Sequence, residues 1–416
     1  MPQLMSGTRQ CRHHELAIRS AGRMTSPPNR IRVLRVIARL NVGGPARHVA
    51  LLGEIDSSGF ETLLAHGIVG PGETEMVDEA EARGLHRILV PELGPKLHWR
   101  QDLVAFGKLL AICRRFQPHI IHTHTAKAGT LGRLAGALYS LSSRRRCWLV
   151  HTFHGHVFEH YFSRSASHIV RLWERLLAII THRIVVLSPR QHAEIVNRFA
   201  IAPARKVRVI PLGLDLESLQ LEGPMPIRDS LDCPAEMPLI GIVGRLVPVK
   251  NHEMFLQASR RLLDCDVAAR FVIIGGGSRE AELRRLAASL RLERHVTFLG
   301  WRRDLADVYR SLDVVALTSR NEGTPVALIE AMAMERVVIA TKIGGVEDIV
   351  EHERTGLLVE SGDVESLAAG MMRLARDRDL RERLGRAARA SVLRMYSKGR
   401  LIADVSSMYR ELMRSA

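Results

Sequence analysis

The chain has 416 residues, 46% of them hydrophobic and 25% charged, which excludes general disorder and suggests two or three domains with substantial cores. Lysine and arginine exceed aspartate and glutamate by 16, so we expect a surface that meets nucleic acid, anionic lipid or a phosphorylated substrate. No apolar run is long enough for a membrane-spanning helix, and no signal peptide is visible, which predicts a cytoplasmic protein. The five cysteines are scattered and odd in number, which indicates reduced thiols.

The excess of basic residues lies in one part of the chain. Residues 96–208 contain 19 Lys or Arg and only four Asp or Glu, whereas residues 209–416 contain 30 of each kind. We call residues 96–208 the basic block. Charge alone does not decide which anion this block meets.

Residues 1–30 are polar and basic without periodicity, and we expect them to form a disordered extension. From Ile31 onward, short apolar runs alternate with amphipathic helical stretches. Continuous apolar strands separated by helices indicate parallel sheets covered on both faces, hence an α/β fold. The expected strands are residues 33–40, 62–69, 119–123, 148–152, 184–187 and 207–210, followed by 239–243, 271–274, 296–299, 314–317, 337–340 and 356–359.

These two series of strands predict two doubly wound, Rossmann-like domains. The first occupies residues 31–214 and the second residues 239–392, and the proline-rich stretch 215–238 links them. Ligands of open α/β sheets bind beyond the carboxyl ends of the strands. A cleft between two such domains is therefore the expected site.

Glycines and histidines follow the strands of the first series. Gly43 and Gly44, before Pro45, could let backbone amides approach an anion at a helix start, although a tight turn is the alternative. Two histidine clusters, His122/His124 and His151/His154/His156, invite a metal interpretation. We disfavour metal, because no acidic or cysteine ligand follows at a useful spacing. His154, before a glycine, is better placed as a polar group that faces the cleft.

In the second series, Arg245 and Lys250 follow a strand closely. Two cations at this position match a diphosphate, and the alternative is two solvated loop cations. The run Gly275-Gly276-Gly277 resembles a phosphate loop, but it could also be a simple turn.

The most informative motif is Asn321-Glu322-Gly323-Thr324-Pro325, followed by an apolar helix that contains Glu330. A buried carboxylate needs hydroxyl or amide partners, which a sugar or ribose ring supplies. The alternative is a helix-capping Glu322 together with a core Glu330 whose hydrogen bonds are satisfied within the protein.

Together these residues resemble the family-4 glycosyltransferases, retaining enzymes of the GT-B fold, over about residues 32–410. Each motif is short, but their order and spacing are specific. The motifs that carry the resemblance are Gly43-Gly44, His154-Gly155, Val186-Leu187-Ser188, Ile210 to Asp215, Gly244-Arg245 with Lys250, Phe298-Leu299-Gly300, Glu322 to Pro325 with Glu330 to Ala333, and Gly344-Gly345.

The resemblance implies the roles of the site residues. Arg245 and Lys250 would hold the donor diphosphate and stabilise the leaving group, and Glu330 would bind the ribose. Glu322, with amides of Gly323 and Thr324, would position the sugar. The remaining residues assigned to the donor are Gly43, Gly44, Pro325 and, near the base, Arg302, while His154 would orient a sugar hydroxyl.

The resemblance also implies front-face transfer with retention, without a classical nucleophile and without a metal or other cofactor. A final helix, within residues 393–416, would cross back to the first domain. The chain departs from the family pattern at Glu335 and Val337, where glycine and proline are usual. Because Glu335 would then be a left-handed residue other than glycine, local stability is expected to suffer by about 1 kcal/mol.

The basic block falls in the domain that the resemblance assigns to the acceptor. We expect Lys96, Arg100, Arg114, Arg115 and Arg144 to Arg146 to be exposed and to attach the protein to the anionic inner face of the cell membrane, where a polyprenyl-diphosphate-linked acceptor resides. The helix within residues 168–183 has an apolar stripe of Ile169, Leu172, Trp173, Leu176 and Ile180. This pattern favours packing on the sheet over a membrane-surface helix.

Three other functions remain as alternatives. A nucleotide-sugar 2-epimerase or a synthase with a soluble acceptor would share the fold. A nucleic-acid-binding protein is disfavoured, because the basic block offers few aromatic residues and no known binding motif. UDP is favoured over GDP as the nucleotide, because it is the commoner choice in the bacterial enzymes that the chain resembles.

Overall fold

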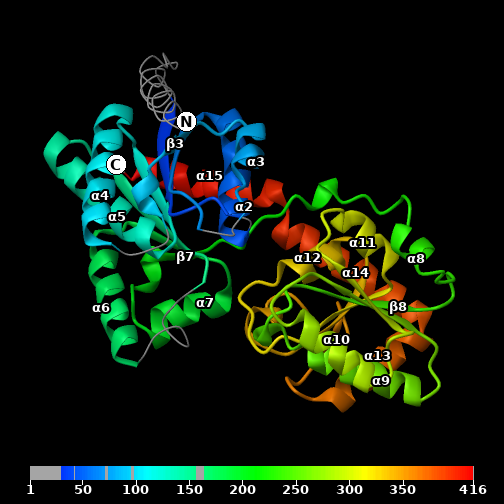
Figure 1. Ribbon diagram of the computed structural model, residues 1–416. Coiled ribbons are helices and arrows are strands. Elements are labelled where there is room, and N and C mark those ends of the chain that lie inside the picture. Colours follow the sequence, from blue (N-terminus) through cyan, green and yellow to red (C-terminus); the bar gives the residue numbers. More distant parts are fainter. Residues whose placement is uncertain (1–29, 42, 71–73, 95–97, 156–163, 416) are drawn as a thin grey trace, which may run out of the picture. The chain divides into compact units, whose positions relative to one another are not determined.

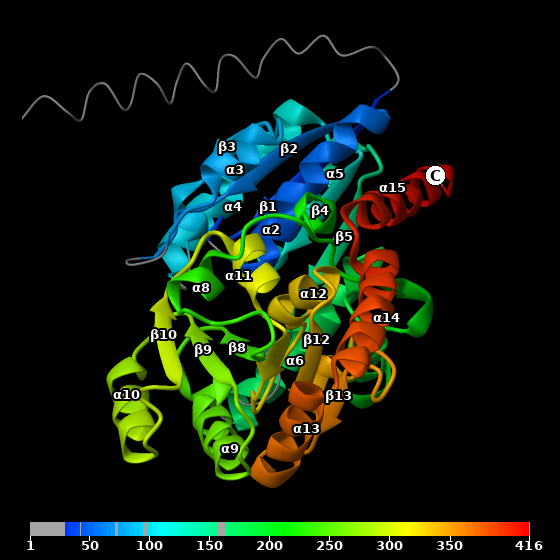
Figure 2. The ribbon, with the colours of Figure 1, turned by 90° about the vertical axis from the view of Figure 1, so that its right-hand side faces the viewer.

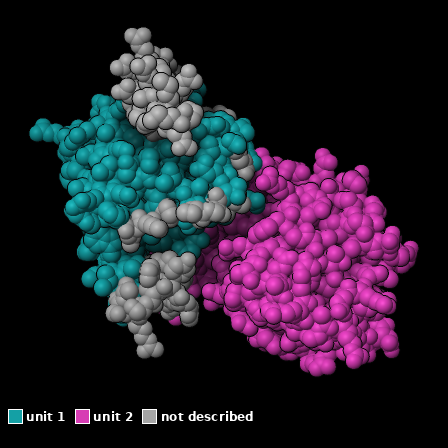
Figure 3. All heavy atoms as spheres, viewed as in Figure 1, with its two compact units in different colours: residues 1–185, 199–208, 405–416 teal, residues 186–198, 209–404 magenta. Residues whose placement is uncertain are grey.

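The computed structural model describes residues 30–415 except 42, 71–73, 95–97 and 156–163. Most of the predicted extension, and also Lys96 and His156, lie outside the described residues. The chain forms two compact units, shown in different colours in Figure 3. Unit 1 comprises residues 1–185, 199–208 and 405–416, and unit 2 comprises residues 186–198 and 209–404. The domain limits expected from the sequence stay a prediction.

Unit 1 is built on a seven-stranded sheet with the order β3-β2-β1-β4-β5-β6-β7. Its first strand is drawn in blue in Figure 1. The pairs that join β3, β2, β1, β4 and β5 are all parallel. Strands β2, β4 and β5 are buried along their whole length, as expected for strands covered on both faces. The strands are β1 (Ile31–Ile37), β2 (Phe60–His66), β3 (Arg87–Leu89), β4 (Ile120–His124), β5 (Trp148–Phe153), β6 (Arg183–Val186) and β7 (Val207–Val209).

Helices cover both faces of this sheet. Helix α4 packs on α5, and α5 packs on α6, whereas α2 packs on α3. The helices are α2 (Gly44–Leu51), α3 (Val77–Ala82), α4 (Trp99–Phe116), α5 (Ala126–Ser143), α6 (Arg164–Ile180) and the part of α15 (Lys398–Arg414) that follows residue 404. Tyr409 of α15 is fully buried, and its hydroxyl lies 2.6 Å from Nδ1 of His122 on β4. This contact attaches the end of the chain to unit 1.

Unit 2 has a six-stranded parallel sheet with the order β10-β9-β8-β11-β12-β13, visible in Figure 2. One hydrophobic core lies under α9, α10 and α13, and another lies under α11, α12 and α14. The strands are β8 (Leu239–Val243), β9 (Arg270–Ile274), β10 (Val296–Gly300), β11 (Val314–Leu317), β12 (Val337–Thr341) and β13 (Leu357–Val359). The helices are α7 (Pro189–Ala193), α8 (Pro226–Ser230), α9 (His252–Asp264), α10 (Glu280–Ser289), α11 (Leu305–Ser311), α12 (Val326–Ala333), α13 (Val364–Arg376) and α14 (Arg378–Tyr396).

The predicted α/β fold with two doubly wound sheets is confirmed. Every predicted strand overlaps an observed one, but strand β3 was missed because it is a half-buried edge strand of three residues. In the described part of the chain, every helix is too short or too polar to cross a membrane.

The predicted packing of the apolar stripe of α6 is wrong for four of its five residues. Ile169, Leu172, Trp173 and Leu176 are exposed, whereas Ile180 packs against the core. The helix turns Ser167, Glu174, Leu177 and Ala178 toward the protein instead. The cause is Arg133 of α5, which is fully buried and forms an ion pair with Glu174 at 2.8 Å. An unpaired buried arginine would be costly, so this pair fixes the rotation of α6 about its axis.

Helix α12 ends at the point where the sequence departs from the family pattern. Glu335 follows it with φ of 58°, in the left-handed region that favours glycine. We expect Glu335→Gly to raise the free energy of unfolding by about 1 kcal/mol, because glycine adopts this backbone without steric cost. Urea unfolding measures the change. Glu335→Ala, which keeps the strain, should bring no such gain, and equal stabilisation by both variants would contradict the explanation.

Candidate active site

Lys250 and Glu322 meet at the carboxyl edge of the sheet in unit 2. Lys250 ends a short helical turn after β8, and Glu322 follows β11; these two strands are parallel neighbours. Nζ of Lys250 forms an ion pair with Oε1 of Glu322. The hydroxyl of Ser319 donates to the same oxygen at 2.6 Å. Both charged side chains are partly buried, so the site has a cation that is neutralised within the protein.

The backbone beside Glu322 is held by the loop that contains Gly344 and Gly345. The amide of Gly345 donates to the carbonyl of Glu322 at 3.1 Å. A Cβ at Gly345 would lie 1.6 Å from the carbonyl oxygen of Gly323, and one at Gly344 would lie 2.1 Å from that of Glu322. Only glycine fits at both positions. The loop therefore fixes Gly323, Thr324 and the buried Pro325, which together precede the positive end of α12.

Glu330 lies within α12 and is partly buried. The hydroxyl of Tyr309, on α11, donates to its Oε2 at 3.0 Å. Sequence reasoning missed Tyr309, which precedes Glu330 by 21 residues and meets it only through the packing of the two helices. The carboxylate is thus oriented by a protein hydroxyl, as the alternative interpretation expected for at least one of its oxygens.

Arg245 and Arg302 differ in their surroundings. Arg245 is exposed, and its side chain has no hydrogen-bond or ion-pair partner among the residues that the structure describes. Arg302 forms an ion pair with Asp304, its Nε lying 2.9 Å from Oδ1, and this pairing raises its pKa. The charge of Arg245 is therefore available to an anion, whereas that of Arg302 is matched locally.

The three consecutive glycines after β9 serve packing. A Cβ at Gly275 would lie 2.0 Å from the carbonyl oxygen of Gly244, and one at Gly276 would lie 2.6 Å from Nε1 of Trp301. A Cβ at Gly277 would lie 2.5 Å from the carbonyl oxygen of Leu246. The glycines are therefore explained by the close approach of the loops after β8, β9 and β10. This agrees with the simpler interpretation of the sequence, a turn rather than a phosphate loop.

In unit 1, His154 follows β5 and belongs to a group of imidazoles. Its Nε2 lies 3.0 Å from Nδ1 of His124, and its ring lies 5.0 Å from that of His48. Burial lowers the pKa of His154 to about 4 and lowers the pKa of His124 well below its usual value. Both rings are therefore neutral at physiological pH. No group of three or more His, Cys, Asp or Glu side chains is placed to hold a metal ion, within the residues that are described.

These neutral histidines predict acid sensitivity. Between pH 6.5 and about 4 the unfolded chain binds protons that the folded chain does not, so the free energy of unfolding falls as the pH falls. The loss is about 1.4 kcal/mol per pH unit for each such histidine. Urea unfolding at pH 7, 6 and 5 should show it, and His154→Gln should flatten the slope. A stability independent of pH over this range would contradict the assignment of neutral histidines.

Gly44 is the first residue of α2, and Gly43 is its N-cap. A Cβ on Gly44 would meet no atom within 4 Å, so the fold of unit 1 does not itself require glycine there. The N-cap is a glycine, so no N-cap side chain accepts hydrogen bonds from the first amides of this helix.

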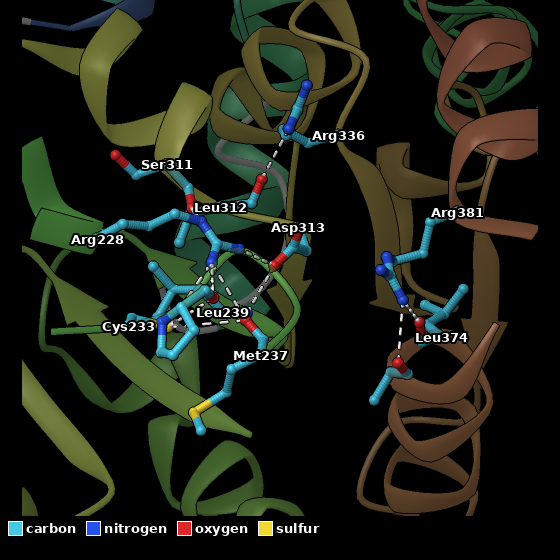
Figure 4. Close-up of polar contacts among 12 residues, drawn as sticks. Arg228, Cys233, Met237, Leu239, Ser311, Leu312, Asp313, Arg336, Leu374 and Arg381 are labelled. Atoms are coloured by element: carbon cyan, nitrogen blue, oxygen red, sulfur yellow. Dashed lines mark hydrogen bonds and ion pairs between the residues drawn. The ribbon is translucent and has the colours of Figure 1, made fainter. Parts of the chain in front are cut away.

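A cavity of about 640 Å³ in unit 2 is separate from the residues above. Seven arginines and four acidic residues line it. Figure 4 shows Arg228 held by Asp313 and by the carbonyl of Ser311, and Arg336 held by the carbonyl of Leu312. These groups precede β8, β11 and β12, at the amino edge of the sheet. Because ligands of such sheets bind at the opposite edge, we do not assign the cavity to the donor site.

Comparison with protein families matches both halves of the chain. The family model described as Glycosyltransferase Family 4 matches residues 42–218, and the model described as Glycosyl transferases group 1 matches residues 226–391. The predicted donor residues of unit 2 all fall within the second match.

Two curated proteins illustrate the similarity. The UDP-Gal:alpha-D-GlcNAc-diphosphoundecaprenol alpha-1,3-galactosyltransferase of Escherichia coli is 28% identical over 313 residues, which cover 74% of this chain and 78% of that protein. The D-inositol 3-phosphate glycosyltransferase of Corynebacterium jeikeium is 30% identical over 307 residues, which cover 69% of this chain and 72% of that protein.

Two solved structures share the fold. A glycosyltransferase from Rickettsia africae has a TM-score of 0.76 and 19% identity, with 93% of this chain and all of that chain covered. The Anabaena protein Alr3699/HepE in complex with UDP has a TM-score of 0.76 and 19% identity, with 92% of this chain and all of that chain covered.

Proposed function

The chain is a family-4 glycosyltransferase with the GT-B fold, and we propose that it transfers a sugar from a UDP-sugar, with retention, to a lipid-linked glycan acceptor. The observation that carries the proposal is the Lys250–Glu322 ion pair at the carboxyl edge of the sheet in unit 2. The E. coli relative, whose name specifies UDP-Gal and a diphosphoundecaprenol acceptor, supports the choice of both substrates.

The ion pair suggests how the donor is bound. A diphosphate would replace Glu322 as the partner of Lys250, and the exposed Arg245 would supply a second cation. The released carboxylate of Glu322 would then accept hydrogen bonds from sugar hydroxyls, together with the amides of Gly323 and Thr324. In this way one rearrangement couples binding of the diphosphate to binding of the sugar.

The remaining residues complete the proposed donor site. Glu330, oriented by Tyr309, would accept hydrogen bonds from ribose hydroxyls. The neutral imidazole of His154 would orient a sugar hydroxyl, since it can accept or donate without adding charge. Further donor contacts are proposed for the amides of Gly43 and Gly44, for Pro325, which sets the start of α12, and for Arg302 near the base.

We propose that the reaction needs no divalent metal, because Lys250 and Arg245 would supply the positive charge that stabilises the leaving diphosphate. Transfer activity is then expected to survive dialysis against EDTA with less than a twofold change. Initial rates before and after treatment measure this. Loss of activity that manganese restores would contradict the proposal.

The test of donor binding is a thermal-shift panel with UDP, GDP and ADP. A ligand at 100 times its Kd adds about 2.7 kcal/mol to the stability of the folded protein, which is readily measured. We expect UDP to give the largest shift. A larger shift with GDP or ADP would overturn the choice of nucleotide, and the absence of any shift would overturn the donor site.

A soluble acceptor is the second candidate, and one observation favours it. The Corynebacterium relative is named for D-inositol 3-phosphate, a small soluble acceptor, and is 30% identical. Transfer to a small sugar phosphate or polyol phosphate in the absence of lipid would favour this candidate. Turnover of donor without any acceptor would instead indicate a nucleotide-sugar 2-epimerase.

A further inference from the structure

Helix α6 exposes an apolar face, which we call the α6 stripe: Ile169 is 70% exposed, Leu172 58%, Trp173 44%, Leu176 50% and Ile179 72%. Positions 169, 172, 173, 176 and 179 follow the period of an α-helix, which places them along one side of the helix. Figure 1 shows α6 in green at the lower left of unit 1. Exposed apolar patches of this kind on the surface of a protein commonly mark sites of interaction with another protein or with a membrane.

Turning the α6 stripe inward would break the contacts that the inner face of α6 makes with the rest of unit 1. The inner face of α6 already packs through Leu177 and Ala178, and it carries Glu174 in its ion pair with the buried Arg133. The indole Nε1 of Trp173 donates to Thr130 of α5 at 3.2 Å, which holds the helix from the side. The outward direction of the stripe is therefore part of the fold of unit 1.

Cations border the stripe. Nη2 of Arg175 donates to the carbonyl of Phe199 at 2.7 Å, and Nε of Arg171 donates to the carbonyl of Ser167 at 3.2 Å. Nζ of Lys206 donates to the carbonyl of Ala178, at the end of α6, at 2.8 Å. These partners are carbonyl oxygens, which do not cancel the positive charge. The only acidic residue between Ser167 and Ile180 is Glu174, and its charge is buried and paired.

We infer that the α6 stripe docks unit 1 on an anionic lipid bilayer, with its apolar side chains among the acyl chains and Arg171, Arg175 and Lys206 at the lipid phosphates. An apolar helix face with a tryptophan and flanking arginines has the chemistry of an interfacial helix. The inference rests on the proposed function, because a lipid-linked acceptor presents its sugar at such a surface. A second copy of the chain fits less well, since it would bring two cationic borders together.

Vesicle flotation tests the inference with the full chain. Wild-type protein should float with vesicles of 30% phosphatidylglycerol and 70% phosphatidylcholine at low salt, and bind pure phosphatidylcholine weakly. Leu172→Gln/Leu176→Gln should bind the anionic vesicles about tenfold more weakly, because two apolar side chains no longer enter the bilayer. The matched control is Leu172→Met/Leu176→Met, which has similar shape and helix propensity but stays apolar and should bind like wild type.

Three results would overturn the inference: no flotation of wild type, equal flotation of the Gln and Met variants, or a wild-type dimer that becomes monomeric in the Gln variant and binds no vesicles. The thermal shift with UDP, measured on the same samples, separates this inference from the proposed function. A normal UDP shift without flotation removes only the membrane surface, whereas flotation without a UDP shift removes only the donor site. The UDP shift also shows that each variant is folded.

Discussion

Lys250→Ala is expected to lower kcat/KM for sugar transfer by about 10²- to 10³-fold. Removing one group that stabilises developing negative charge typically costs this much, and Lys250 is the partly buried cation next to Glu322. The variant should fold normally, because Ser319 still donates to Glu322. Initial rates over a range of donor concentrations measure the effect.

The matched control for this prediction is Lys342→Ala. Lys342 also lies in unit 2, but its side chain is half exposed and its nearest carboxylates are 4.0 Å away. This variant should keep kcat/KM within about twofold of wild type, since exposed ion pairs contribute little. If Lys250→Ala retained activity comparable to that of Lys342→Ala, Lys250 would have no role at the diphosphate.

Glu174→Leu is expected to lower the free energy of unfolding by about 3–5 kcal/mol. The change leaves the guanidinium of Arg133 buried without its carboxylate, which is the costly case for a buried ion pair. Burial lowers the pKa of Arg133, because the protein interior disfavours its charge. Urea unfolding of the wild type and the variant measures the loss.

The double variant Arg133→Met/Glu174→Leu distinguishes the charge from the packing. Because it removes both charges and keeps apolar side chains of similar volume, it should recover most of the lost stability. Recovery of less than about 1 kcal/mol would mean that the geometry of the pair, rather than the burial of an unpaired charge, accounts for the loss.

The fold could be predicted because its strands are continuous apolar runs in the sequence, such as Leu239–Val243 and Val314–Leu317. The left-handed residue at Glu335 could be anticipated from the glycine that the family pattern has there. The orientation of α6 could not be predicted from the sequence. Its apolar stripe suggested a core face, and the ion pair that decides otherwise joins Arg133 to Glu174 across 41 residues.

In the candidate site, too, single residues could be predicted but their contacts could not. Lys250 and Glu322 each stood out in the sequence, since charged residues after apolar strands suggest a ligand. Their pairing depends on β8 and β11 being neighbours, which the order of strands along the chain does not reveal. Tyr309 carried no signal at all, because a tyrosine in an amphipathic helix indicates only packing until its partner Glu330 is placed beside it.

The most direct test of the account is transfer of label from a panel of radiolabelled UDP-sugars to a synthetic GlcNAc-diphospho-polyprenol, with the anomeric configuration of the product determined by NMR. We expect one UDP-sugar to label the lipid acceptor through an α-linkage, and we expect the rate of labelling to be about 10²- to 10³-fold lower in Lys250→Ala. A β-linked product, or donor turnover that leaves the lipid unlabelled, would contradict the account.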